Sequence, residues 1–209
     1  MRNIAAAAHT SKRLMDTWFR GFVPGRPLSP NLLGFWYGGS KEIDDMLCDQ
    51  FKNDAERALV NREFRERMKS TQEGTLALTL LLDQVPRNIF RGTSRPFVEF
   101  DPLARETVKE ALAKNTCGQM HPVFRHFLYM PLEHSENHED QAACVKEFTK
   151  EYEKVEPMYK EMFKSALEYA KAHEAVIEKF GRFPHRNDVL GRVHTEAERI
   201  HLETGGDRW

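Results

Sequence analysis

The sequence has few cysteines, no excess of charge of one sign and no long hydrophobic run. Its three cysteines, Cys48, Cys117 and Cys144, are widely spaced and form no C-x-x-C pair, so neither a disulfide framework nor a thiolate zinc site is indicated. We expect them to be buried thiols in a reducing, intracellular compartment. The 31 basic residues are balanced by 32 acidic residues, which argues against a nucleic-acid-binding protein because such proteins normally carry a basic excess. A mean hydropathy of −0.63 and the lack of an apolar run approaching ~18 residues exclude a transmembrane helix.

What the sequence does contain is the pattern of a folded helical protein. Its 209 residues suit one domain, or one domain with an appendage. From residue 32 onward apolar side chains recur every three or four positions, and the uniformly apolar stretch over 75–82 predicts a central buried helix. The start signals are Asp101-Pro102, Ser135 and the pair Thr195 and Glu198, and Gly181 is expected to end a long helix over about 156–180. We predict an all-α protein, with helices paired as a tetratricopeptide-like array of antiparallel hairpins.

Residues 1–30 differ in composition from the rest of the chain. Asp16 is their one acidic residue, against the basic residues Arg2, Lys12, Arg13, Arg20 and Arg26. A stripe at helical spacing is formed by Ile4, Ala8, Ser11, Met15, Trp18 and Phe22. An acid-poor amphipathic segment is typical of a mitochondrial transit peptide; the alternative is a structural helix that docks Trp18 and Phe22 on the core. Prolines then interrupt the helix, so the sequence divides into an N-terminal helical extension with a Pro-rich linker, 1–30, and a helical domain, 31–209.

Three polar segments interrupt the helical pattern of that domain. The first follows the apolar helix and contains Asp83, Gln84, Arg87, Asn88 and Arg91. Asp83 and Arg87 are four residues apart and can pair on one helix face, which would make them a buried ion pair with Asn88 as a cap. The alternative is that these groups serve a bound ligand, because buried polar groups need partners.

The second segment runs over residues 129–138. Glu133 and His134 stand near a proline break, where such a pair suits a general base, a metal ligand or a helix cap. His134 and His138 are four residues apart and can reach one metal ion. This spacing alone is a weak signal, and a place on the solvated face of the helix is the favoured interpretation of His138.

The third segment runs over residues 180–192. Its three arginines are Arg182, Arg186 and Arg192. With His185 and Asn187 between them, guanidinium forks of this density can build an anion pocket. The alternative is an Arg-rich surface turn that pairs with neighbouring acids such as Glu174.

The chain from residue 32 to about residue 202 resembles the family catalogued as domain of unknown function 924. The matching strings are LGFWYG at 33–38, LLDQVPRNIFRGT at 81–93, FLYMPLEHSE at 127–136, FGRFPHRN at 180–187 and LGR at 190–192. The chain departs from the family pattern at Val85, where phenylalanine is usual, and at His194, where serine normally precedes the threonine. The resemblance implies a tetratricopeptide-like helical fold, and the family has no established activity.

The resemblance and the residue patterns single out the same three segments, so we expect these to converge in one polar pocket that binds an anionic small molecule. The candidate catalytic residues are Glu133, His134 and His185. The candidate ligand-binding residues are Trp36, Asp83, Gln84, Arg87, Asn88, Arg91, Tyr129, Arg182, Arg186, Asn187 and Arg192. No metal, cofactor or nucleic acid is expected, and the reaction class is left open between pure binding and hydrolysis. The alternatives are an interaction scaffold for a protein partner and an accessory subunit of a larger, mitochondrial assembly.

Overall fold

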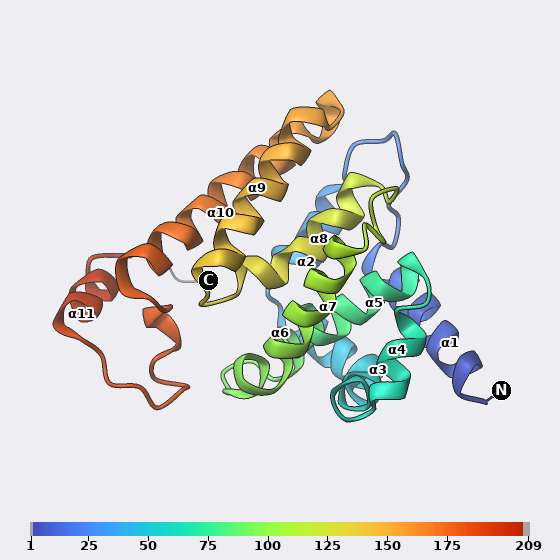
Figure 1. The fold of residues 1–209 in the computed structure, drawn as a ribbon, viewed down its shortest axis with the longest axis horizontal. Helices are drawn as coiled ribbons and strands as arrows, with labels where there is room; N and C mark the ends of the chain where they lie inside the picture. The colour runs from blue at the N-terminus through green and yellow to red at the C-terminus, as the bar shows by residue number, and fades with distance from the viewer. Residues whose placement is uncertain (1, 207–209) are drawn as a thin grey trace. The chain divides into compact units, whose positions relative to one another are not determined.

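The computed structural model describes the backbone of residues 2–206 and the side chains of residues 6–206, so the basic residue Arg2, and Ile4 of the predicted stripe, lie outside the described side chains. Over this range the regular structure is helical and contains no strand, which confirms the all-α prediction (Figure 1). None of the described helices is long and apolar enough to cross a membrane. The chain forms two compact units: unit 1 comprises residues 1–91 and 95–131, and unit 2 comprises residues 92–94 and 132–209.

Unit 1 contains the helices of the N-terminal part of the chain. They are α1 Arg2–Trp18, α2 Pro30–Tyr37, α3 Lys41–Val60, α4 Arg62–Met68, α5 Gln72–Leu82, α6 Gln84–Ile89, the π-helical turn Pro96–Phe100, α7 Asp101–Ala113 and α8 Pro122–Glu133. Helix α5 is central, since residues 74–82 are all buried and the helix contacts α1, α3 and α7. The uniformly apolar stretch therefore predicted its position correctly. Side-chain caps fix several of the helix starts, as where the Thr71 hydroxyl accepts the Gly74 amide at 2.9 Å.

Helix α1 packs against α5 and α4 as part of the core of unit 1. Trp18 is buried, and its ring meets those of Phe35 at 5.4 Å and Phe127 at 5.7 Å. This is the position that the docking interpretation of the segment predicts. The predicted stripe was right at Ser11 and Trp18 and one residue off at Ala8 and Met15, because the buried positions of this face are Ala7, Ser11, Leu14 and Trp18. These positions follow the 4-3-4 spacing of one straight helix face.

Unit 2 is built on a long helical hairpin. Its elements are the last two residues of α8, then α9 His138–Lys154, the 3-10 turn Pro157–Tyr159, α10 Lys160–Phe180, the 3-10 turn Pro184–Arg186 and α11 Glu196–Glu203. Helices α9 and α10 lie side by side and antiparallel (Figure 1). Phe148 and Phe163 are fully buried in this unit. As predicted, Gly181 ends α10. Its φ of 69° and the hydrogen bond from its backbone N–H to the Ile177 carbonyl are those of a left-handed helix cap.

Three of the expected helix starts differ from those in the structure, whereas the predicted capping box is present. Pro157 begins a 3-10 turn, so α10 starts at Lys160. Ser135 is not the cap of α9; Asn137 accepts the Asp140 amide, while the Ser135 hydroxyl donates to the Asp140 carboxylate at 2.7 Å. Asp101 is the first residue of α7 and not its cap, because its carboxylate binds an arginine. The capping box of Thr195 and Glu198 is present as predicted.

Of the three cysteines, Cys117 and Cys144 are buried thiols, while Cys48 is half-buried.

The docking of α1 can be tested by replacing Trp18 with alanine. The change removes a fully buried indole, so we expect the free energy of unfolding to fall by about 3–5 kcal/mol in urea denaturation. Lys12→Ala is the control, because its side chain lies on the exposed face of the same helix and pairs only with the exposed Asp16; it should leave the transition in place. Equal stability of the Trp18→Ala variant and the parent protein would contradict the docked position.

Candidate functional site

The first polar segment forms a buried ion cluster in unit 1. The guanidinium of Arg87 binds both carboxylate oxygens of Asp101, at 2.7 and 3.0 Å, and lies 3.2 Å from a carboxylate oxygen of Asp83. Asp83 has no exposed surface. Burial alone would lower the pKa of Arg87, but the charges of Asp101 and Asp83 outweigh it and raise this pKa above its ordinary value. The structure therefore contains the expected pair of Asp83 and Arg87 and adds Asp101, which the sequence analysis had taken for a helix cap.

The other polar residues of this segment are held by unit 1 itself. Asn88 donates to the Gln84 carbonyl at 2.8 Å, and Gln84 donates to the Asp83 carboxylate. Arg91 makes a two-bond pair with Asp44 at 2.8 and 2.9 Å, and about half of the Arg91 side chain is exposed.

The two predicted aromatic walls are also core residues of unit 1. Trp36 is buried and donates its indole N–H to the Trp18 carbonyl at 2.7 Å, and Tyr129 is buried. Neither side chain has much surface with which to contact a ligand.

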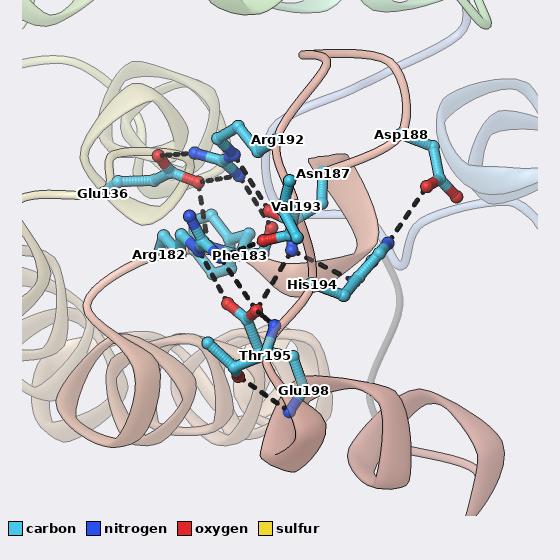
Figure 2. Close-up of polar contacts among 10 residues, drawn as sticks. All are labelled: Glu136, Arg182, Phe183, Asn187, Asp188, Arg192, Val193, His194, Thr195 and Glu198. Carbon is cyan, nitrogen blue, oxygen red and sulfur yellow. Dashed lines mark hydrogen bonds and ion pairs between the residues drawn. The ribbon is translucent and has the colours of Figure 1, made fainter.

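In unit 2, the loop after α8 is joined to the third segment through Glu136 (Figure 2). The carboxylate of Glu136 accepts two bonds from Arg192, at 2.7 and 3.0 Å, and the Phe183 amide at 2.8 Å. Burial by itself would raise the pKa of Glu136, but these bonds bring the pKa below its ordinary value. Arg192 also donates to the Phe183 carbonyl at 3.0 Å. The second and third polar segments therefore meet.

A second part of the same network surrounds Asn187, which has no exposed surface. Its amide oxygen accepts from Arg192 at 2.9 Å, and its amide nitrogen contacts His194 at 3.1 Å and the Glu198 carboxylate at 3.3 Å (Figure 2). Glu198 also accepts two bonds from Arg182, at 2.6 and 2.8 Å. The bonds from Arg182 and from the capping box lower the pKa of Glu198 to about 2.

Next to this network, two histidines and one arginine gather around a buried phenyl ring, and a third histidine lies beside one of the two. We call this group, His134, His173, Phe183, His185 and Arg186, the Phe183 cluster. The Arg186 guanidinium lies 4.3 Å from the Phe183 ring centre, and the rings of His173 and His185 lie 5.5 and 5.6 Å from it. Arg186 donates to the His134 carbonyl at 2.9 Å, and the His134 ring lies 6.4 Å from that of His173. His134 and His185 are half-buried, whereas the other three members are buried.

Burial and positive neighbours keep His173 and His185 neutral. The pKa of His173 is lowered to about 3, first by burial and then by His134 when it is protonated, by Arg186 and by His185 when it is protonated. The pKa of His185 is lowered to about 4, again by burial first and by Arg186 next. These two imidazoles therefore carry no charge at neutral pH and can accept a proton.

Behind the cluster, Glu133 lies between His173 and Cys144. The Nδ1 atom of His173 lies 2.8 Å from the Tyr169 carbonyl, to which it donates when neutral, and 3.5 Å from a Glu133 oxygen. The Cys144 sulfur lies 4.0 Å from the other Glu133 oxygen. Burial and the charge of Glu133 raise the pKa of the Cys144 thiol well above its ordinary value. The thiol is therefore protonated at neutral pH and is not an activated nucleophile.

The structure changes the charge balance that the sequence suggested. Arg87, Arg91, Arg182 and Arg192 each form an ion pair with a carboxylate of their own unit. The surplus of positive charge expected from five arginines is thus largely neutralised by acids distant in sequence. The meeting of the first segment with the other two in one pocket stays a prediction.

Sequence reasoning missed that Asp101 binds Arg87 in unit 1 and that Cys144 lies beside Glu133 in unit 2. Asp101 and Cys144 carried no signal beyond a helix start and an apolar helix face. His173 was noted from its position one to two turns before the third segment, and the structure places its ring beside Phe183. The described residues contain no group of three or more His, Cys, Asp and Glu side chains that could hold a metal ion.

The structure defines the class of protein as an all-helical protein with arginine–carboxylate ion pairs, and this class is not tied to one reaction. The chain belongs to the family described as bacterial protein of unknown function (DUF924), whose model matches residues 14–206. It is similar to a solved protein of unknown function from Agrobacterium tumefaciens, with 30% sequence identity and a TM-score of 0.78, over 95% of this chain and 99% of that one. No curated protein matches the chain. The family match begins inside α1, so it takes in Leu14 and Trp18, which the sequence resemblance left out.

The Arg87 ion cluster can be tested by Arg87→Met, which keeps the aliphatic stem and removes the charge. The carboxylates of Asp83 and Asp101 would remain buried without their cation, so we expect the free energy of unfolding to fall by about 3–5 kcal/mol. Arg91→Met is the matched control, because solvent screens its exposed pair with Asp44; its loss should stay below about 1 kcal/mol. Urea denaturation of both variants checks this, and similar losses for the two would contradict it.

A pH dependence follows from the buried histidines of both units. Burial lowers the pKa of His126 in unit 1 to about 3, and its Nε2 atom lies 2.8 Å from the Tyr37 hydroxyl. The unfolded chain takes up a proton near pH 6.5 and the folded chain does not, so stability is lost as pH falls below about 6.5. Each such histidine should lower the free energy of unfolding by about 1 kcal/mol between pH 7.5 and 5.5.

Urea denaturation at these two pH values measures the effect. His126→Gln, which keeps an acceptor for Tyr37, should reduce the loss of stability between them, while His138→Gln at an exposed position should not. An unchanged pH dependence in His126→Gln would contradict the assignment.

Proposed function

We propose that the protein binds an anionic small molecule, a phosphate ester or a carboxylate, at the Phe183 cluster of unit 2. The observation that carries this proposal is the grouping of one guanidinium and two imidazoles, those of Arg186, His173 and His185, around the Phe183 ring, with a third imidazole, that of His134, beside His173. These are the side chains that donate strong, charge-assisted hydrogen bonds to anions. His134 and His185, the half-buried members, supply the surface from which a ligand would enter.

The electrostatics of the cluster support the same proposal. Burial is the largest cause that lowers the pKa values of His173 and His185, and the charge of Arg186 adds to it in both. Arg186, and the imidazoles when they are protonated, supply positive charge that a bound anion would neutralise. The carbonyl of His134 holds one end of the Arg186 guanidinium, so the arginine is oriented before a ligand arrives.

A hydrolytic reaction is the finer form of this proposal. A neutral imidazole can take a proton from water, which is the task of a general base. His185 is neutral at pH 7 and half-buried, so it suits this task better than the buried His173. With a pKa of about 4, His185 is a weak base. We therefore propose anion binding as the function and hydrolysis as a secondary possibility of the same site.

The alternative function is an accessory subunit or interaction scaffold, with a protein as partner. The hairpin of α9 and α10 is the observation that favours it, because tetratricopeptide-like arrays are assembled from such antiparallel pairs and bind peptides along them. A mitochondrial assembly is the setting that the amphipathic α1 suggests. The half-buried imidazoles beside Arg186 favour the anion site over this alternative.

Calorimetric titration with inorganic phosphate, phenyl phosphate and acetate tests the proposal. We expect binding by the unaltered protein, and a loss of affinity of at least about tenfold in Arg186→Gln and in His185→Gln. His185→Gln is included because its side chain is half-buried and the variant should fold even where the arginine variant does not. Arg199→Gln removes an exposed charge from the same unit, where Arg199 pairs with Glu196, and should bind as the parent does.

Failure of the unaltered protein to bind any of the three anions would contradict the proposal and favour the scaffold. Unchanged affinity in both site variants, with helical content confirmed by circular dichroism, would contradict the placement of the site.

A further inference from the structure

The groups that face the Phe183 cluster come from every element packed around it. They are Glu133 at the end of α8 and His134 after it, Glu136 in the loop that follows, Cys144 and Glu147 on α9, His173, Glu174 and the Tyr169 carbonyl on α10, His185 and Arg186 in the 3-10 turn, and Arg192 after it. Arg192 is paired with Glu136, so Arg186 is the fixed positive charge within the cluster while the imidazoles are neutral. The balance of charge in the cluster therefore changes with the protonation of its imidazoles.

From this balance we infer that an anion bound at the Phe183 cluster takes up a proton on the cluster's imidazoles, so that the site favours the dianion of a phosphate monoester over a monoanion of the same shape. The inference rests on the proposed function and names its ligand class and its dependence on pH.

The hydrogen bonds show where such a proton would go. Neutral His173 donates its Nδ1 proton to the Tyr169 carbonyl, so its Nε2 atom is the acceptor of the neutral ring. Protonation turns that atom into a second donor. His185 offers the same change at a half-buried position between Arg186 and His134.

Linkage between the two events is reciprocal. Negative charge at the cluster favours the protonated imidazoles, and protonated imidazoles bind negative charge more tightly by the same factor. A second negative charge on the ligand interacts with every cation of the cluster, so a dianion gains more than a monoanion from each proton taken up.

Phenyl phosphate and phenyl sulfate provide a matched pair of probes. The two have the same ring and a similar head group, but the sulfate keeps a single charge at all pH values used. We expect phenyl phosphate to bind at least about tenfold more tightly at pH 7.5. Phenyl sulfate does not titrate, so its affinity reports on the protein alone; we expect it to rise by about three- to tenfold from pH 7.5 to 6.0.

Proton uptake is measured directly by calorimetry in two buffers of different ionisation enthalpy. Uptake should be positive for the unaltered protein, reduced in His185→Gln and unchanged in the control His138→Gln, which alters an exposed histidine of α9. Phenyl phosphate binding that is weaker in His185→Gln but still measurable, with less proton uptake for each ligand bound, would show that the imidazole acts through its proton and not only through packing.

The outcomes distinguish this inference from the proposal of anion binding on which it rests. If both probes bind with equal affinity, or if phenyl sulfate binds with no dependence on pH and no proton uptake, the inference is overturned and anion binding stands. If neither probe binds at any pH between 7.5 and 6.0, both are overturned.

Discussion

Half-buried guanidinium groups held by carboxylates are the interaction on which the packing of both units depends. Arg87, on α6, binds Asp83 at the end of α5 and Asp101 at the start of α7, so one side chain fixes three helices. In unit 2, Arg192 holds Glu136. Removing such charges from water costs several kcal/mol per ion, and only a well-oriented partner offsets this cost. A displaced helix would leave a charge buried without its partner, and the pairs therefore specify where the helices lie.

Asn187 performs the same task with a neutral amide. Its oxygen accepts from Arg192, so its nitrogen must be the atom that faces Glu198 and His194. The reverse orientation would set a donor against the Arg192 guanidinium and an acceptor against the Glu198 carboxylate. It follows that His194 accepts through Nδ1 and donates through Nε2 to Asp188, 3.0 Å away. His194 is a position where the chain departs from the family pattern, and its ring links Asn187 to Asp188 by hydrogen bonds.

The local features of the fold could be predicted from sequence, and the partners of the polar residues could not. Apolar spacing identified α5 as central, and Gly181 and the capping box of Thr195 marked true helix ends. Ser135 was misassigned because several polar residues near a helix start can each serve as its cap. The carboxylates that bind Arg87 and Arg192 lie 14 and 56 residues away. No local pattern indicates such pairs, so polar density was mistaken for surplus charge.

The Phe183 cluster differs from these ion pairs in what holds it together. Its histidines contribute to folding by staying neutral, since a charged imidazole among Arg186 and its neighbours would be repelled and poorly hydrated. An anion bound as proposed would reverse that preference, because the proton that destabilises the cluster without a ligand would stabilise the cluster with one. Under that proposal, the stability of unit 2 without a ligand and its affinity for an anion change in opposite directions as the pH falls. Such opposition is the expected property of a binding site, where groups are kept in an arrangement that a ligand completes.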